Sequence, residues 1–315
     1  MFFSVFKKTP FQVAWFYKPG IKRKIKDLIN NKKPDYIHCH TIRMSEYVKD
    51  IKGIPKSIDF MDAYSVGMKK RSLTEKNILK RLIFKHEHNK LVRYEADMMN
   101  YFDQYCMISE QDCRAIVHPK RTEIKVVPNG VDFTGFHPKE AQEKYDIGFM
   151  GNLSYPPNIQ AVSYIANKII PLLIKEKPDT KFMVAGVNVS PKIKALHSEH
   201  VDVVGFFEDV SDAIAQCKIM LAPMIISIGL QNKILQAMAM KVPNVITSAA
   251  NNAIGAPDKQ AVIEANTPEE FRDAILDLLY HPDKAERIGT KGYHFVKERL
   301  YWDHQNKKLL KLIKE

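Results

Sequence analysis

The sequence predicts an α/β protein with two Rossmann-like, doubly wound domains. Short apolar segments alternate with amphipathic helical segments along the chain, and this alternation is typical of parallel sheets with right-handed helical crossovers. The length of 315 residues is sufficient for two domains that each bury a core. We expect the first domain at residues 1–143, the second at 144–292 and a C-terminal helix at 293–315.

The first domain contains four segments that predict strands. They lie at residues 35–40, 56–61, 105–109 and 125–128. A basic amphipathic helix is expected at 21–30, and a long helical stretch, broken once, at 73–100. Ser109 follows the third strand as a helix N-cap, and the Asn-Gly pair at 129–130 turns the chain after the fourth strand. The segment at 11–17 predicts a strand or a buried connector.

The second domain repeats the pattern with further expected strands. They lie at residues 146–150, 181–186, 201–205, 219–223, 244–247 and 261–264. Helices are expected between them, including one at 158–176, which begins after a stop at Pro156-Pro157, and one at 209–217. More helices follow from Thr267 onward. A doubly wound sheet is therefore the expected architecture of this domain.

The segment at 229–246 predicts a loop, a helix, a tight turn and a strand. Its apolar residues recur at helical spacing, and Pro243 prevents the helix from continuing. The first helical turn contains Gln231, Asn232 and Lys233. Amide groups at a helix start, the positive end of the helix dipole and a lysine together favour anion binding. An ordinary surface helix cap is the alternative explanation of the same pattern.

The charge balance is strongly basic, with 48 Lys and Arg against 36 Asp and Glu and a formal net charge of +12. Basic residues are dense near the N-terminus, for example at 22–24 and 69–71. A solvated charged face is one explanation, and electrostatic contact with an anionic membrane leaflet is the other. The basic segments lack interleaved aromatic residues and match no nucleic-acid-binding motif, so no nucleic-acid partner is expected.

The cysteines and the apolar runs indicate a cytoplasmic location. Four scattered cysteines show no metal-knuckle or redox-motif spacing, so we expect reduced thiols. No apolar run reaches the roughly 18 residues that span a bilayer. The apolar start at 1–6 is short and is followed, not preceded, by lysines, which argues against a signal peptide.

The histidines do not predict a metal site. His38 and His40 lie on one face of an expected strand, whereas His86 and His88 point apart on an expected helix. The chain has no H-E-x-x-H motif, and it has no G-x-S-x-G elbow of a serine hydrolase. We therefore expect no metal ligands and no cofactor.

Several segments occur together in the order found in a known family. They are Val127-Pro-Asn-Gly-Val-Asp132, Ile147-Gly-Phe-Met-Gly-Asn-Leu-Ser-Tyr-Pro-Pro-Asn158, Val203-Val-Gly-Phe-Phe-Glu-Asp209, Gly229-Leu-Gln-Asn-Lys-Ile-Leu-Gln-Ala-Met-Ala239 and Tyr301-Trp302. Over nearly the whole chain, the sequence resembles GT-B glycosyltransferases of the large retaining family 4, especially the bacterial polysaccharide-biosynthesis branch.

The resemblance implies a GT-B fold of two Rossmann-like domains. In this family the C-terminal helix crosses back to the first domain, and Trp302 would lie at the crossing; a simple core helix is the alternative. The family's first domain normally begins with a strand and a glycine-rich loop. No such unit precedes Phe11, so we expect the N-terminal domain to be incomplete.

The resemblance also implies a donor site in the second domain. Lys233 is the expected ligand of the donor diphosphate, because this family uses a helix N-terminus and basic side chains where other enzymes use a metal. Gly151 and Asn152 occupy the loop after the domain's first strand, where many relatives have an arginine and then a lysine. This chain has Pro156-Pro157-Asn158 there, so that clamp is missing or rebuilt. Phe206 is expected to contact the base.

Two glutamates, separated by seven residues, mark the family's donor segment. Their positions hold Ile228 and Gln236. Gln236 can still hydrogen bond to the ribose without a charge, whereas the role of the first glutamate is lost or moved. Gln231 and Asn232 complete the expected donor-binding residues.

Asp62 is the catalytic candidate of the first domain, beside Lys233 of the second. It follows a strand end, where relatives have an acidic residue that would orient an acceptor or sugar hydroxyl. A helix N-cap is the alternative. The basic run at 69–71 follows and would face an acceptor phosphate, or else solvent.

The function implied is transfer of a sugar from a nucleotide-diphosphate donor to a glycan or lipid-linked acceptor in bacterial surface polysaccharide synthesis. The family further implies retention of anomeric configuration, and the basic surface would allow peripheral contact with the inner membrane face. The alternative is a non-catalytic GT-B-like protein that binds nucleotide or a partner subunit.

Overall fold

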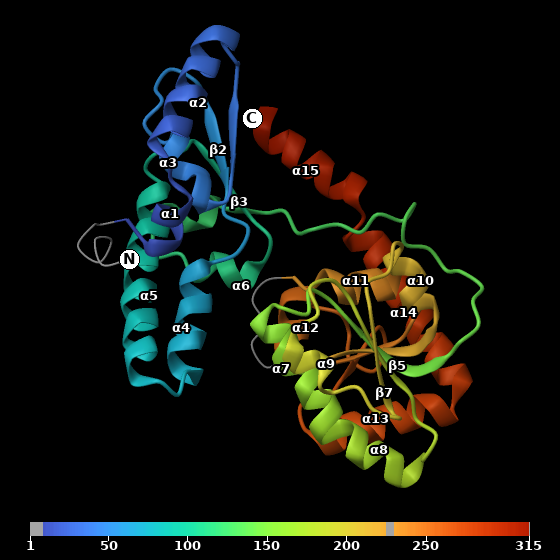
Figure 1. The fold of residues 1–315 in the computed structure, drawn as a ribbon. Helices are drawn as coiled ribbons and strands as arrows, with labels where there is room; N and C mark the ends of the chain where they lie inside the picture. The colour runs from blue at the N-terminus through green and yellow to red at the C-terminus, as the bar shows by residue number, and fades with distance from the viewer. Residues whose placement is uncertain (1–8, 225–229, 315) are drawn as a thin grey trace. The chain divides into compact units, whose positions relative to one another are not determined.

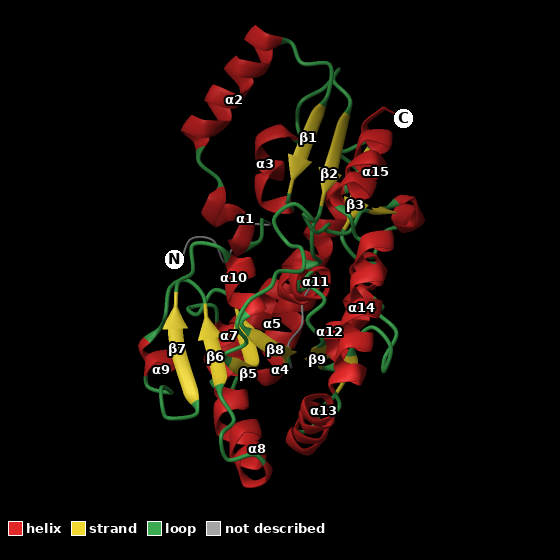
Figure 2. Ribbon diagram, turned by 90° about the vertical axis from the view of Figure 1, so that its right-hand side faces the viewer, coloured by secondary structure: helices red, strands yellow, loops and turns green. Residues whose placement is uncertain are grey.

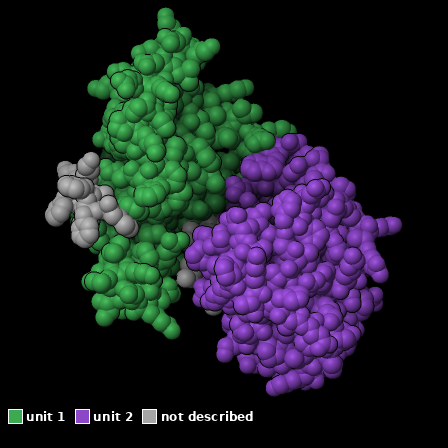
Figure 3. All heavy atoms as spheres, in the orientation of Figure 1, with its two compact units in different colours: residues 1–128, 305–315 green, residues 129–304 purple. Residues whose placement is uncertain are grey.

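A computed structural model describes residues 9–224 and 230–314 of the chain. These residues form two compact units (Figures 1 and 3). Unit 1 comprises residues 1–128 and 305–315, and unit 2 comprises residues 129–304. Unit 2 begins before residue 144 because Val131 and Phe133 pack into its core.

Unit 1 contains a four-stranded parallel sheet. Its strands are β1 (Ile37–His40), β2 (Lys56–Asp59), β3 (Gln104–Met107) and β4 (Lys125–Val126), in the order β1-β2-β3-β4. All four lie within the segments expected from the sequence, give or take one residue. Ile58, Tyr105 and Met107 are buried in the core of this unit.

The helices of unit 1 flank this sheet. They are α1 (Phe11–Phe16), α2 (Pro19–Lys32), α3 (Ser45–Val48), α4 (Tyr64–Thr74), α5 (Ile78–Met98) and α6 (Glu110–Cys113), with short 3₁₀ turns at Ile42–Met44 and Pro119–Glu123. The predicted break in the long helical stretch separates α4 from α5. Ser109 is the N-cap of α6, as expected, because its side chain accepts a hydrogen bond from the backbone N–H of Asp112.

The expectation of a strand or connector at 11–17 is wrong, because this segment forms helix α1. The Glu87 carboxylate accepts hydrogen bonds from the backbone N–H groups of Phe11 and Gln12, both at 2.9 Å. These are N–H groups that a helix start leaves without a partner inside the helix. Glu87 belongs to α5, so the cap of this helix comes from a residue far along the chain.

Unit 2 contains a six-stranded parallel sheet (Figure 2). Its strands are β5 (Tyr145–Met150), β6 (Phe182–Ala185), β7 (Val201–Gly205), β8 (Cys217–Ala222), β9 (Asn244–Ile246) and β10 (Ile263–Glu264), in the order β10-β9-β8-β5-β6-β7. The chain therefore winds outward from β5 in one direction and from β8 in the other. In such a sheet ligands bind at the carboxyl ends of the strands, near the point where the order reverses.

Helices cover both faces of this sheet. They are α7 (Pro156–Tyr164), a π-helical turn (Ile165–Ile169), α8 (Ile170–Glu176), α9 (Pro191–Lys194), α10 (Val210–Ala215), α11 (Asn232–Ala239), α12 (Ser248–Ile254), α13 (Pro268–Tyr280) and α14 (Pro282–Arg299). Successive side chains of β5 point to opposite faces, so Phe149 and Met150 belong to different core clusters.

The helix after β5 begins earlier than expected. Pro156 and Pro157 form its first turn and do not precede it. Proline is well tolerated at this position because the first N–H groups of a helix have no partner within the helix. As a consequence, Asn158 is the third residue of α7 and lies close to the end of β5.

The expected single helix at 293–315 is also wrong. Helix α14 ends at Arg299, and α15 (Trp302–Lys314) begins after a break. In the break, Tyr301 pairs with Val131, whose N–H donates to the carbonyl of Leu300 at 2.7 Å. A Cβ on Gly130 would lie 2.7 Å from the Cα of Trp302, so only glycine allows this approach. Residues 305–315 group with unit 1.

Candidate functional site

A pocket of about 200 Å³ lies at the carboxyl ends of β5, β6 and β7 in unit 2. Its lining includes four residues selected from the sequence, namely Gly151, Phe206, Lys233 and Gln236. They come from the ends of β5 and β7 and from the first turns of α11. The sheet topology thus brings distant parts of the sequence together at the position where doubly wound sheets bind ligands.

Two glycines allow the strand ends to approach one another. A Cβ on Gly186, directly after β6, would overlap the carbonyl oxygen of Gly151. A Cβ on Gly151 would lie 2.7 Å from Nδ2 of Asn158 and 3.3 Å from Nζ of Lys233. The two glycines therefore allow the ends of β5 and β6, and the side chains of Asn158 and Lys233, to pack closely together beside the pocket that both glycines line.

Lys233 is fixed in the pocket by Asn158. Its Nζ donates a hydrogen bond to Oδ1 of Asn158 at 2.7 Å and lies 4.1 Å from the ring centroid of Phe149. Asn158 is buried, and its Nδ2 donates to the carbonyl oxygen of Asn152 at 3.0 Å. The amide thus ties the ammonium group to the loop after β5.

Burial lowers the pKa of Lys233 to about 7, far below the ordinary value of 10.5. Its hydrogen-bond partner Asn158 is neutral, so it satisfies the ammonium group without compensating its charge. An anion entering the pocket would supply the missing charge and favour the protonated form.

The start of α11 adds further polar groups at this edge. Gln231 is the N-cap residue, and the backbone N–H groups that follow begin the helix. Asn232 is exposed, and its Oδ1 accepts a hydrogen bond from Nδ2 of Asn129 at 3.4 Å. The positive end of the helix dipole therefore lies in the same turn as Lys233. Gly229 and Ile228 lie outside the described residues.

Phe206 and Gln236 occupy different parts of the lining. The Phe206 ring follows Gly205 at the end of β7 and is 67% exposed, which is unusual for a side chain of this size. An exposed ring at a pocket mouth is suited to stacking on a planar base. Gln236 stands one turn after Lys233 in α11 and brings an amide into the same pocket.

Asn152 lies near the pocket without lining it. Its Oδ1 accepts hydrogen bonds from the backbone N–H and the hydroxyl of Ser154, at 3.1 and 2.8 Å. Its side chain therefore folds back on its own loop, and its carbonyl anchors Asn158. Sequence reasoning did not assign roles to Asn158 and Gly186. The sequence features that could have indicated these roles are the position of Asn158 in the segment that replaces the family's basic clamp and the position of Gly186 directly after a strand.

Asp62 lies in unit 1, between β2 and α4. The N-cap of α4 is Ala63, so Asp62 does not serve as this cap. Its Oδ1 is buried and has no hydrogen-bond partner among the described residues. Burial raises the pKa of Asp62 to about 6, the charges of Asp112 and Asp59 add to the shift, and Arg43 opposes it. Oδ1 of Asp62 is thus a buried acceptor whose hydrogen-bonding capacity is unused among the described residues.

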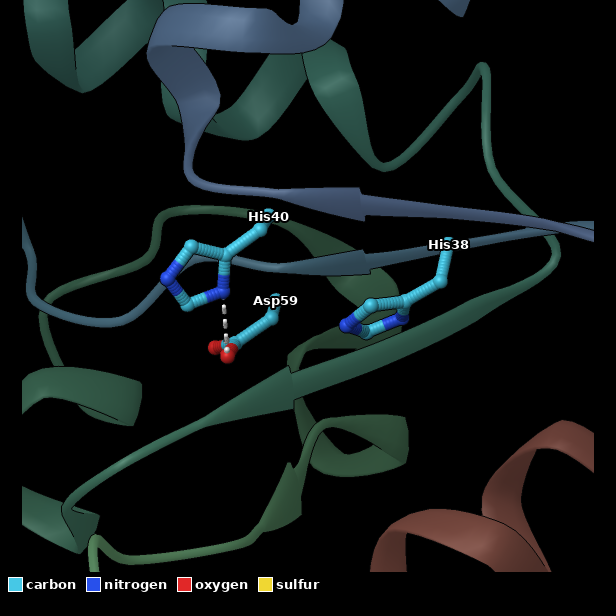
Figure 4. Close-up of side chains that lie close together, drawn as sticks. All are labelled: His38, His40 and Asp59. Atoms are coloured by element: carbon cyan, nitrogen blue, oxygen red, sulfur yellow. Dashed lines mark ion pairs between the residues drawn. The ribbon is translucent and has the colours of Figure 1, made fainter.

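His38, His40 and Asp59 form a cluster in unit 1 (Figure 4). One ligand atom of each lies within 4.8 Å of the others. Strand register explains the grouping, because His40 is opposite Asp59 and His38 is opposite Ser57 in β1 and β2. His40 Nδ1 lies 3.3 Å from Asp59, and His38 Nδ1 lies 2.8 Å from the Ser57 hydroxyl. Both rings therefore have protein partners, and the expected absence of a metal stays a prediction.

Comparisons with known proteins agree with this architecture. Residues 144–281 match the family model of the glycosyl transferases group 1. A Klebsiella pneumoniae protein described as an uncharacterized 44.6 kDa protein in the cps region is 25% identical over 297 residues, which cover 88% of this chain and 74% of that protein.

Solved structures share the fold at low sequence identity. Sucrose-phosphate synthase from Thermosynechococcus elongatus matches with a TM-score of 0.75 and 12% identity, covering 94% of this chain and 77% of that chain. HepE from Anabaena, in complex with UDP and glucose, matches with a TM-score of 0.72 and 14% identity, covering 92% and 81%. The chain therefore has the GT-B fold of these structures, and its residues 144–281 match the glycosyl transferases group 1 family.

Proposed function

We propose that the pocket of unit 2 binds the nucleotide diphosphate of a sugar donor, and that the protein transfers the sugar to a glycan or lipid-linked acceptor of a bacterial surface polysaccharide. The observation that supports this most is the position of Lys233, held by Asn158 in a pocket that Gly151 and Gly186 also line, beside a helix start. The HepE structure with UDP and glucose and the Klebsiella relative from a cps region support the donor class and the setting.

Each pocket residue has a distinct proposed role. Phe206 stacks on the base, Gln236 hydrogen bonds to the ribose, and Lys233 with the start of α11 binds the diphosphate. In the reaction the acceptor oxygen bonds to the anomeric carbon and releases its proton to an oxygen of the leaving diphosphate. The bond between that carbon and the diphosphate breaks with its electron pair on the departing oxygen. The ammonium group and the helix dipole stabilise that negative charge. Asp62 orients an acceptor or sugar hydroxyl.

We also propose that the transfer retains anomeric configuration and needs no bound metal. NMR of the first-formed product distinguishes retention from inversion, and a rate unchanged by EDTA supports the metal-free reaction. None of the described helices has the length and hydropathy of a membrane span. We propose a cytoplasmic location with peripheral contact at the inner membrane face.

A panel of nucleotide sugars tests the donor site. A ligand that binds the folded chain raises its melting temperature, by an amount corresponding to about 2.7 kcal/mol at a hundredfold excess over Kd. The Lys233→Gln variant should lose this shift, whereas Lys241→Gln, an exposed lysine just after the same helix, should keep it. Equal shifts in both variants would contradict the site.

Turnover of the donor distinguishes a glycosyltransferase from a non-catalytic protein with the same fold. Hydrolysis or transfer of the stabilising donor supports the transferase. A chain that binds the nucleotide sugar but never cleaves it, even with extracted acceptor, is the non-catalytic protein. The replacement of the family's glutamates at Ile228 and Gln236 is the feature that makes this alternative worth testing.

A further inference from the structure

Helices α4 and α5 of unit 1 pack side by side as a hairpin (Figure 1). The turn between them is held by its own hydrogen bonds. The Asn77 side chain caps α5 by accepting from the backbone N–H of Lys80 at 3.1 Å, and Glu75 accepts from the N–H of Asn77 at 3.0 Å. At the sheet end, the N–H of Ser65 donates to Glu95 at 3.0 Å. The hairpin therefore has a defined structure, with hydrogen bonds that fix both of its ends.

The end of this hairpin exposes an apolar patch. Its large aliphatic side chains, each between 57% and 75% exposed, are Leu73, Ile78, Leu79, Leu82 and Ile83. The other face of α5 packs inward, with Phe84 against the core and Leu91 buried within it. The exposed aliphatic side chains therefore do not belong to the face of α5 that packs into the core. Neighbouring exposed apolar residues of this kind indicate an interaction surface.

Basic side chains surround the patch. Residues 69–85 contain Glu75 as their sole acidic residue. The basic ones beside the apolar patch are Lys69, Arg71, Lys76, Lys80, Arg81 and Lys85. Long basic side chains can keep their charges in the headgroup layer while neighbouring aliphatic groups enter the acyl region.

We propose that this hairpin end, residues 73–85, docks on an anionic lipid bilayer. An anionic bilayer satisfies both observations at once, because its headgroups attract the lysines and its acyl chains accept the leucines and isoleucines. A nucleic acid would complement the charges but not the five aliphatic side chains. This inference rests on the proposed function, because membrane docking would bring the protein to a lipid-linked acceptor in the same membrane.

Vesicle binding of the full chain tests the proposal. Partitioning is measured by flotation with phosphatidylcholine vesicles, with and without phosphatidylglycerol. The chain should bind the anionic vesicles, and added salt should weaken binding. The Lys80→Gln/Arg81→Gln variant should bind about 25-fold more weakly, since each basic residue contributes about 1 kcal/mol, which is about fivefold. The Leu79→Ser/Ile83→Ser variant should lose binding at least tenfold.

Matched variants control for general loss of charge or apolar surface. Lys192→Gln/Lys194→Gln removes two exposed lysines from α9, and Ile21→Ser/Leu28→Ser removes two exposed aliphatic side chains from α2. Both should bind anionic vesicles within about twofold of the natural chain. A Leu79→Cys chain with an environment-sensitive dye should report an apolar surrounding in vesicles, and the four natural cysteines are buried.

Several outcomes would overturn the proposal. Equal binding to neutral and anionic vesicles would do so, as would loss of binding in the α2 pair with normal binding in the hairpin variants. Dissociation of a dimer by Leu79→Ser/Ile83→Ser, without a change in vesicle binding, would assign the patch to a second copy of the chain. Hairpin variants should keep the nucleotide-induced thermal shift. Vesicle binding without any nucleotide binding would contradict the proposed function and leave the docking surface intact.

Discussion

Donor affinity should fall as the pH rises above about 7, because Lys233 loses its proton in the empty pocket. Burial lowers its pKa to about 7, and a bound pyrophosphate would raise that pKa again. Above this pH, donor binding must therefore be accompanied by protonation of Lys233. Each pH unit then reduces affinity about tenfold, which corresponds to about 1.4 kcal/mol. A lysine with the ordinary pKa of 10.5 would give constant affinity from pH 6 to 9.

The assay is calorimetric titration with the nucleotide sugar that gives the largest thermal shift. A nucleotide sugar is preferable to UDP, because a terminal phosphate has its own ionisation near pH 6. Affinity should fall about tenfold from pH 6 to 8 and about tenfold again from 8 to 9. At pH 8, the dependence of heat on buffer should reveal uptake of about one proton per donor bound.

The Asn158→Asp variant provides the second arm. It would place a carboxylate where the amide oxygen now lies, 2.7 Å from Nζ of Lys233. The pKa of the lysine should then rise, so affinity should be weaker at pH 6 and nearly constant up to pH 9. A flat profile in the natural chain, or an unchanged profile in this variant, would refute the role given to Lys233.

Three further predictions concern other residues. Gln236→Ala should lower affinity for both the stabilising nucleotide sugar and its free nucleoside about two- to tenfold by isothermal calorimetry, whereas Lys233→Gln should leave nucleoside binding unchanged. The reverse pattern would exchange their roles. Gly186→Ala should lower the free energy of unfolding by about 1–3 kcal/mol in urea, because its Cβ would overlap a carbonyl oxygen, while Gly20→Ala, with open space around it, should not destabilise the chain. Asp62→Asn should raise the free energy of unfolding at pH 7.5 by about 1–3 kcal/mol, because the carboxyl group has a pKa of about 6 in the folded chain but ionises near pH 4 in the unfolded chain. This gain in stability should shrink to about half at pH 5, and a gain independent of pH would contradict the raised pKa of Asp62.

The sequence was sufficient to predict the strands of both sheets and helix α11, because these elements follow local hydrophobic patterns. It also grouped Gly151, Phe206, Lys233 and Gln236, which line one pocket in the structure. That grouping came from the resemblance to a family, since a pattern of local periodicity does not specify which strand ends are neighbours.

Contacts between distant residues explain what the sequence did not predict. Helix α1 begins with N–H groups bonded to Glu87, and no local pattern around residue 11 contains that carboxylate. The anchoring of Lys233 by Asn158 likewise joins two separate βα connections. Asp59 meets His40 only through the register of two strands.

The bridge between Val131 and Tyr301 determines how the second lobe, unit 2, can be excised. A fragment limited to residues 144–281 would lack Val131, and it would also lack Phe295 and Val296, which help to close the same core. Both flanks of the chain are therefore structural parts of that lobe. Cutting at 129 and 304 preserves them, so a fragment made to test nucleotide binding should be trimmed there and not at the edges of the family match.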